Sequence, residues 1–169
     1  MGSELLYQKD KIHLVPILDE HLYLTSGNDV PDVFEIHNTK PGQIICYNLR
    51  FPKITRYLSF QGAKIIFYVT QWTTTNLNHW RTLLKARAIE NCVYVIACNS
   101  VGDVNNENHI GNTYTGHSMA IDSNGKIVKE AADQEPIITV EIDLTKIEEQ
   151  RQNIPIFKNF RPDVYKYTK

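Results

Sequence analysis

The chain has 169 residues, of which 42% are hydrophobic and 22% charged, as expected for one soluble globular domain that spans residues 1–169. Its formal charge of −1 excludes the basic surface of a nucleic-acid-binding protein or of a protein that binds anionic membranes. No apolar run reaches the roughly 18 residues of a membrane helix and no signal peptide opens the chain, so we expect no membrane association.

The three cysteines indicate reduced thiols. Cys46, Cys92 and Cys98 form no close pair and show no metal-binding spacing. The sequence therefore predicts a cytoplasmic protein without a bound metal or cofactor.

The first forty residues are predicted to hold little regular structure. Residues 4–8 are expected to form a short strand, and residues 9–14 an extended segment. Asp19, Glu20 and His21 follow a proline and precede a Ser-Gly-Asn turn, so we place them in a loop or a single helical turn. Residues 33–36 are predicted as a strand and residues 38–42 as a hairpin turn. His13 and His21 have no partners at metal-ligand spacing, and we interpret both as structural hydrogen-bonding residues.

The stretch from Gly42 to Pro52 predicts a strand that turns directly into a helix. Residues 43–45 resemble the end of a buried strand, and Pro52 suits the first turn of a helix because it lacks an N–H group. Cys46 therefore lies at the corner between the two elements. Backbone N–H groups at such a corner can hold an oxyanion, although Cys46 could also be only a small apolar residue at a strand end.

The remaining elements alternate between strands and helices, which indicates an α/β layer structure. In chain order we expect a helix from Pro52 to about Gly62, a strand at 64–70, a helix at 78–91, a strand at 92–98, a polar loop at 102–113, strands at 114–121 and 126–130 around an Asn-Gly turn, a strand at 137–142, a helix at 144–150 capped from Asp143, and a tail at 151–169. Cys92 and Cys98 are an even number of residues apart, so both are predicted to pack in the core from one face of a strand.

Residues 43–52, Gln-Ile-Ile-Cys-Tyr-Asn-Leu-Arg-Phe-Pro, resemble the Cys-Tyr-Asp-Leu-Arg-Phe-Pro signature of the nitrilase superfamily, the carbon–nitrogen hydrolases. Four further stretches follow the family's order. These are the lysine motif at 11–14, the segment of the second glutamate at 19–21, the Trp-to-Arg-Ala-x-Glu-Asn helix at 79–91, and the Gly-x-Ser stretch at 114–118. The resemblance extends from about residue 5 to residue 165.

The resemblance implies amide hydrolysis through a cysteine thioester. By it, Cys46 is the nucleophile, Lys11 stabilises the oxyanion together with the N–H of Tyr47, and Glu20 orients the lysine and the substrate. Lys9 offers a competing register, but only Lys11 stands two residues before the His-Leu pair.

The match is closest to omega-amidase-like members, which act on monoamides of short dicarboxylic acids. Arg50 could then bind the carboxylate of such a small-molecule substrate, or it could form a structural salt bridge.

The resemblance also implies an incomplete α-β-β-α sandwich. The family's general-base glutamate precedes the lysine motif, and no carboxylate of this chain has a matching context. We therefore expect a domain that is N-terminally truncated relative to the family, with impaired activity and uncovered apolar faces. A homo-oligomer, or association with the missing N-terminal part, is expected. The alternative is an inactive fragment that serves at most as an interaction module.

Two local differences from the family bear on the site. Asn48 stands where the signature usually has Asp, so a charge beside the nucleophile is lost. The Thr73-Thr74-Thr75 run replaces a more usual proline-bearing loop near the cleft.

Overall fold

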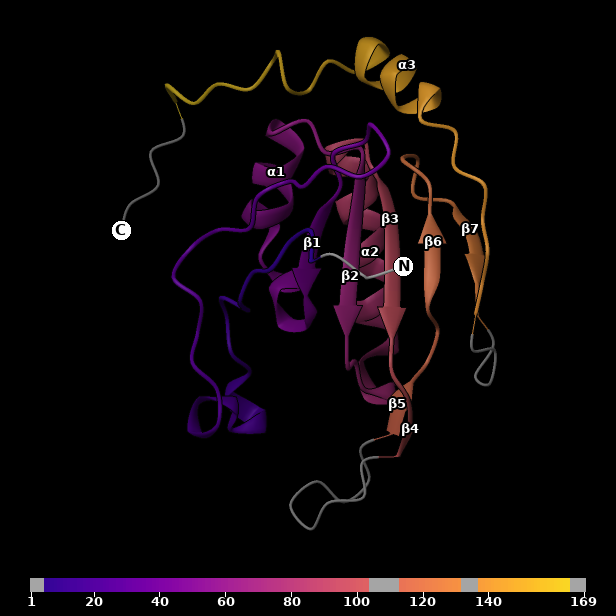
Figure 1. Cartoon of the computed structure of the whole chain (residues 1–169). Helices are drawn as coiled ribbons and strands as arrows, with labels where there is room; N and C mark the ends of the chain where they lie inside the picture. The colour runs from indigo at the N-terminus through magenta and orange to yellow at the C-terminus, as the bar shows by residue number, and fades with distance from the viewer. Residues whose placement is uncertain (1–4, 104–112, 132–136, 165–169) are drawn as a thin grey trace.

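The computed structural model describes residues 5–103, 113–131 and 137–164 (Figure 1). In chain order its elements are η1 (Pro16–Leu18), η2 (Glu20–Leu22), β1 (Gly42–Ile45), η3 (Cys46–Arg50), α1 (Pro52–Phe60), β2 (Ile65–Thr70), η4 (Thr74–Asn76), α2 (Leu77–Asn91), β3 (Tyr94–Asn99), β4 (Val101–Asp103), β5 (Thr113–Thr115), β6 (Met119–Ile121), β7 (Ile127–Glu130) and α3 (Thr145–Asn153), where η marks a 3₁₀ helix. In this part of the chain, no helix is both long and apolar enough to cross a bilayer.

A five-stranded sheet in the order β1-β2-β3-β6-β7 forms the centre of the fold. Strands β1, β2 and β3 are parallel, because α1 and α2 provide the crossover that each parallel connection requires. Strands β6 and β7 extend the sheet in antiparallel fashion through the Asp122–Gly125 turn. Strands β4 and β5 form a separate pair. The predicted α/β layer structure is confirmed.

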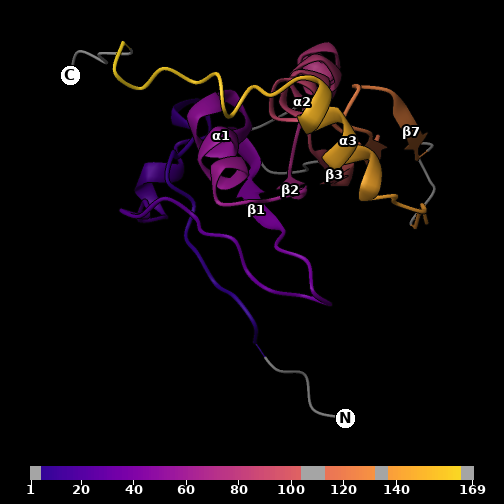
Figure 2. The ribbon, with the colours of Figure 1, turned by 90° about the horizontal axis from the view of Figure 1, so that it is seen from above.

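Helices α1 and α2 cover one face of the sheet, as the view from above shows (Figure 2). Alternate residues of the strands point into this interface, and they are almost fully buried. They include Ile44, Ile66, Tyr68, Val95, Ala97, Met119 and Ile121. From the helices, Leu58, Trp80 and Leu84 fill the same core. Burial of these side chains is the main source of stability of the fold.

The opposite face of the sheet carries no helix among the described residues (Figures 1 and 2). Val69 of β2 is 47% exposed and Val128 of β7 is 45% exposed. Cys98 of β3 is also exposed, whereas Phe67 and Ile96 are half-buried. We call this surface the open sheet face.

Three predicted strands are absent from the described structure. Residues 5–8 and 137–142 form no strand, and residues 33–36 contribute a single bridge, between Ile36 and Thr39. Side chains provide partners for part of this backbone: the Asp32 N–H donates to the Tyr7 hydroxyl at 2.9 Å, and the Val33 N–H donates to Gln61 Oε1 at 2.9 Å. Apolar alternation alone does not create a strand without a neighbouring strand.

The predicted position of β3 was early by two residues. Cys92 is the left-handed cap that ends α2, with a φ of 46°, and the strand begins only at Tyr94. Cys92 is buried as predicted, and burial raises the pKa of its thiol. The prediction for Cys98 was wrong, because Cys98 lies on the face of β3 opposite Val95 and Ala97, and no helix among the described residues covers that face.

The segment predicted as one strand at 114–121 is divided in two. Its start lies in β5, which pairs with β4, and its end lies in β6, with Gly116 to Ser118 between them. Residues 101–103 and 113–115 therefore pair as strands at the ends of the predicted polar loop, whose residues 104–112 lie outside the described part of the chain.

Helix α3 lies at the end of the sheet where β2 and β3 begin. Arg151 donates to the carbonyl of Ala63 at 2.6 Å and to that of Cys92 at 3.2 Å. The N-cap of the helix is Leu144 rather than Asp143; Asp143, one residue earlier, accepts hydrogen bonds from the N–H and hydroxyl of Thr145, and these bonds lower the pKa of Asp143.

A buried hydroxyl pair between α1 and β2 gives a test of the core. Thr55 Oγ1 and the Tyr68 hydroxyl lie 2.6 Å apart with no exposure, and burial raises the pKa of the Tyr68 phenol. We expect Tyr68→Phe to lower the free energy of unfolding by about 1–3 kcal/mol in urea titrations, because it leaves the Thr55 hydroxyl without this partner. Tyr57→Phe, which removes an exposed hydroxyl from the same helix, should change it by less than about 0.5 kcal/mol.

Removing both hydroxyls should cost less than the sum of the single changes. We expect Thr55→Val combined with Tyr68→Phe to recover part of the loss, since neither polar group is then left unpaired. Strict additivity of the two changes would contradict the role assigned to this pair.

Candidate active site

Cys46 lies at the corner between β1 and η3, as the sequence predicts. Its φ of 45° is in the left-handed region, which is unusual for a residue with a side chain. Strained residues of this kind concentrate at functional sites. The cysteine is partly exposed, and the next residue, Tyr47, presents the first N–H of the turn beyond it.

Arg87 of α2 holds this corner from the core side. Its Nε and Nη2 donate to the Leu49 carbonyl at 3.2 and 3.1 Å, and its Nη1 donates to Glu90 Oε1 at 2.7 Å. Arg87 is 95% buried, so these contacts are part of the core rather than a surface ion pair. The Arg-Ala-x-Glu-Asn stretch of the helix therefore fixes the turn that carries the cysteine.

Asn48 ties the lysine segment to the same turn. Its Oδ1 accepts hydrogen bonds from the backbone N–H of His13 at 3.0 Å and from His13 Nδ1 at 2.9 Å. The His13 ring also stacks on Phe51, with ring centroids 3.5 Å apart. His13 is thus a structural hydrogen-bonding residue, as predicted. A carboxylate oxygen could accept the same two hydrogen bonds. With Asn48 in place of the usual Asp, the site therefore loses a negative charge but keeps the hydrogen-bond acceptor.

Lys11 and Glu20 form a close ion pair. The Lys11 ammonium lies 2.7 and 2.6 Å from the two Glu20 oxygens, and Glu20 Oε2 also accepts the Val15 N–H at 2.7 Å. The two side chains are only 12% and 18% exposed, which limits screening of the pair by solvent. Lys9, the competing candidate, instead lies 3.8 Å from Asp32.

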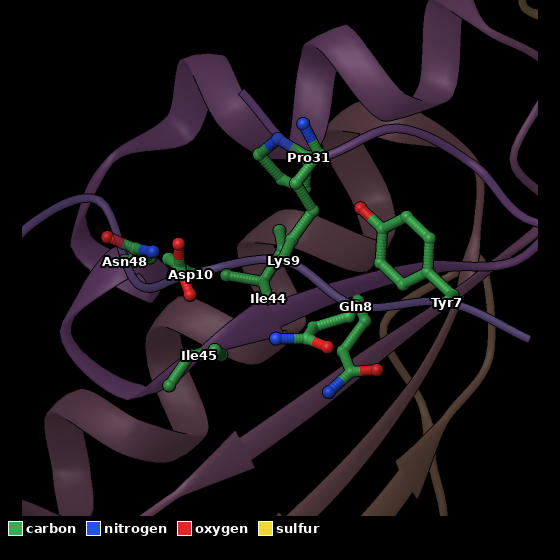
Figure 3. Close-up of a pocket in the computed structure, with 9 residues that line it drawn as sticks. Tyr7, Gln8, Lys9, Asp10, Pro31, Ile44, Ile45 and Asn48 are labelled. Carbon is green, nitrogen blue, oxygen red and sulfur yellow. The ribbon is translucent and has the colours of Figure 1, made fainter. Parts of the chain in front are cut away.

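A cavity of about 190 Å³ separates the lysine segment from the cysteine corner (Figure 3). Asp10, which immediately precedes Lys11, lines it together with Ile45 and Asn48, which stand on either side of Cys46 in the chain. Figure 3 shows Asp10 and Asn48 next to each other at one end of the cavity. The cavity thus brings the segment that precedes Lys11 next to residues on either side of Cys46, although neither Lys11 nor Cys46 itself lines it.

Arg50, at the end of η3, stacks on an aromatic ring. Its guanidinium carbon lies 4.8 Å from the centre of the Trp72 ring, and its side chain is otherwise exposed. Within residues 5–103, 113–131 and 137–164, Arg50 pairs with no carboxylate, so the structural salt bridge considered from the sequence is not formed there. The stacked geometry leaves the N–H edge of the guanidinium accessible.

The sequence analysis missed Trp72 and Asn99. Trp72 follows β2 and Asn99 ends β3, so both lie at the carboxyl edge of the parallel strands, where Cys46 also lies. Ligands of open α/β sheets bind at this edge. The signal that the sequence offered was a polar residue, Asn99, at the end of an apolar strand.

The assembled groups suit covalent catalysis at an acyl carbon. They comprise a thiol at a strained corner, an ammonium held by a carboxylate, a backbone N–H next to the thiol, and an accessible guanidinium. The described residues contain no cluster of three or more His, Cys, Asp or Glu side chains that could hold a metal ion.

Comparison with known proteins gives consistent matches. The family model described as carbon-nitrogen hydrolase matches residues 1–152. The chain is 49% identical to the "hydrolase in agr operon" of Staphylococcus lugdunensis over 97% of its own length and 68% of the relative's length. It is 38% identical to the 2-oxoglutaramate amidase of Bacillus subtilis over 96% of its own length and 61% of that enzyme.

A solved structure of the same family has a similar fold. The crystal structure of a carbon-nitrogen hydrolase from Helicobacter pylori superposes with a TM-score of 0.83 at 28% identity. The superposition covers 92% of this chain and 57% of that structure. The chain thus spans between about half and two thirds of the length of these proteins.

The hydrogen bonds from His13 to Asn48, which we call the Asn48 tether, predict different effects for replacing Asn48 by Ala and by Asp. Asn48→Ala removes both hydrogen bonds to His13, and we expect the His13 amide to exchange with solvent about tenfold faster or more, measured by NMR. Asn48→Asp keeps an acceptor at the same position and should keep the protection. Asn78→Ala, on the exposed surface of α2, serves as the control. Equal exchange rates in the Asp and Ala variants would contradict the tether.

Proposed function

This chain belongs to the carbon–nitrogen hydrolase family, and we propose that it hydrolyses a non-peptide amide to a carboxylic acid and ammonia through a thioester on Cys46. The single observation that carries the proposal is the position of the Lys11–Glu20 ion pair in a segment that hydrogen-bonds to the Cys46 turn. The roles assigned below to individual residues are part of the proposal.

The reaction proceeds in two halves with Cys46 as nucleophile. In the first, the thiol gives its proton to a general base, the sulfur attacks the amide carbon, and the C–N bond breaks as the nitrogen leaves with a proton as ammonia. In the second, water attacks the thioester, the C–S bond breaks, and the sulfur regains its proton. The products are the free acid and the thiol.

Lys11 and the Tyr47 N–H are assigned to the oxyanion that forms in both halves. An ammonium is an effective partner for such a charge when it is already in place and shielded from water. Glu20 supplies this preorganisation, because its two oxygens hold the Lys11 ammonium while the Val15 N–H holds Glu20. We therefore assign to Glu20 a positioning role.

We assign the general base to a second carboxylate. Among the described residues, the carboxylate that contacts Lys11 is Glu20, and it is already engaged by the ammonium and by a backbone N–H. The second carboxylate would belong to the part of the family fold that the relatives possess beyond the 61–68% of their length that this chain matches. Without it, the rate should fall by about 10²–10⁴.

The open sheet face supports association with the part of the family fold that lies outside the matched length of the relatives. It exposes Val69 on β2 and Val128 on β7, and it also carries the half-buried side chains of Phe67 on β2 and Ile96 on β3. An apolar sheet face of this kind is stable in water when a second layer covers it. We propose that the covering layer is the remaining sheet of the α-β-β-α sandwich. Homo-oligomerisation and a cytoplasmic location stay predictions from the sequence.

The proposed substrates are monoamides of short dicarboxylic acids. Arg50 is stacked on Trp72 with its N–H edge accessible, which suits bidentate binding of a substrate carboxylate. The 2-oxoglutaramate amidase of Bacillus subtilis is named for a substrate of this class, at 38% identity to this chain.

Ammonia release tests the proposed chemistry. The chain, joined to the N-terminal part of the Bacillus subtilis relative, should release ammonia from such monoamides, and Cys46→Ala should abolish turnover. Lys11→Gln should lower kcat by about 10²–10³, because the oxyanion loses its cationic partner. Lys40→Gln is the control and should change kcat less than about threefold, since its ion pair with Glu35 is exposed and Lys40 does not line the cavity. Full activity in Cys46→Ala would refute the mechanism.

Alkylation of the chain by itself tests whether Cys46 is activated. Cys98 is an internal control, because it is exposed and has no assigned role, whereas burial raises the pKa of Cys92 and should make it the slowest. With iodoacetamide at pH 7 and peptide mapping, we expect Cys46 to react about tenfold faster than Cys98 despite its lower exposure. If Cys46 reacts no faster than Cys98, the inactive interaction module becomes the better account.

A further inference from the structure

The side chain of Asn99, at the carboxyl edge of the sheet, makes several buried hydrogen bonds. Asn99 is 94% buried. Its Oδ1 accepts the Trp72 N–H at 2.6 Å and the Thr70 hydroxyl at 2.8 Å. Its Nδ2 donates to the Trp72 carbonyl at 3.2 Å and to the Gly116 carbonyl at 2.9 Å. A single amide thus satisfies four groups on three residues, which belong to the end of β2 with its following loop and to the turn before β6.

Two of these bonds go to the backbone of the same residue. The carboxamide of Asn99 pairs with both the N–H and the carbonyl of Trp72, as a neighbouring strand would. This fixes the two peptide groups on either side of Trp72, which stands two residues beyond the end of β2. The indole is fixed separately, since Trp72 Nε1 donates to the Asn76 carbonyl at 2.8 Å and the ring packs 5.7 Å from Trp80.

The Gly116 segment is tied to the same residue. The backbone N–H of Asn99 donates to Ser118 Oγ at 3.0 Å, in addition to the contact with Gly116. Asn99 therefore joins the loop after β2 to the turn before β6, and the loop cannot shift without breaking several buried hydrogen bonds.

The contacts lead from Asn99 to Trp72 and from Trp72 to Arg50, whose side chain is exposed. Its guanidinium carbon lies over the Trp72 ring, 4.8 Å from the centroid, and this cation–π contact restricts an otherwise flexible side chain to a position over the face of the ring. The position of the ring thus decides where the guanidinium edge points. Bidentate binding of a carboxylate depends strongly on that direction.

We propose that Asn99 is a positioning residue that holds Trp72, and through it Arg50, in place, and so sets the preference of the site for amides that carry a carboxylate. Asn99 itself touches no substrate in this account. The inference rests on the proposed function for its effect on substrate choice, but its structural half can be measured without turnover.

The kinetic test compares two substrates in the joined protein described above. One is the monoamide of succinic acid, and the other is butyramide, an uncharged amide of the same chain length. Asn99→Ala should lower the ratio of kcat/KM for the charged over the neutral amide about tenfold, mainly through KM of the charged substrate. Arg50→Gln should lower the same ratio, and the double variant should lower it no further than Arg50→Gln alone.

Asn91→Ala is the matched control, because Asn91 is another fully buried asparagine that does not contact the Trp72 loop. It should leave the ratio unchanged even if it destabilises the fold. If Asn99→Ala lowers kcat/KM equally for both amides, its role is only structural and the inference is wrong.

Tryptophan emission distinguishes this failure from a failure of the proposed function. The chain has two tryptophans, so Trp80→Phe leaves Trp72 as the single reporter. In that background Asn99→Ala should shift the emission to longer wavelength, as the loop opens to water, and Asn91→Ala should not. An unchanged emission would overturn the positioning role whatever the kinetics show. A shift without hydrolysis of either amide by the parent would support the positioning of Trp72 and refute the hydrolase proposal.

Discussion

The functional geometry depends on the two hydrogen bonds that Asn48 Oδ1 accepts from His13. Residues 5–14 belong to no helix or strand, so side chains must hold them against the rest of the fold. The contact between Asn48 and His13 holds this segment in place. His13 stands two residues after Lys11, and Asn48 stands two residues after Cys46. Without this contact, the ammonium and the thiol would belong to segments that move independently.

The other half of the arrangement follows from the direction of the strands. Because β1, β2 and β3 are parallel, the residues at their carboxyl ends meet at one edge of the sheet: Cys46, the Trp72 loop and Asn99. Buried polar groups then fix each position, with Arg87 binding the Leu49 carbonyl and Asn99 binding the backbone of Trp72. Rigid placement by such contacts is what preorganised catalysis requires.

The sequence predicted the α/β layers and the strand-to-helix corner at Cys46, because apolar runs, Pro52 and the Asn-Gly turn are local signals. It also named Lys11 and Glu20, which the structure brings together as an ion pair. It placed Cys98 in the core, since an apolar run does not show which face of its strand the helices cover. It did not detect Trp72 or Asn99, because their contacts join segments that are far apart in the sequence, and no periodicity reports such contacts.

The central claim is that the sulfur at residue 46 and the ammonium at residue 11 serve one reacting centre. The most direct test is a crystal structure of the chain after iodoacetamide has attached a carbonyl group to Cys46. We expect the added carbonyl oxygen to lie about 3 Å from Lys11 Nζ, within hydrogen-bond distance. A carbonyl that points away from Lys11, with the lysine segment on another side of the molecule, would contradict the account.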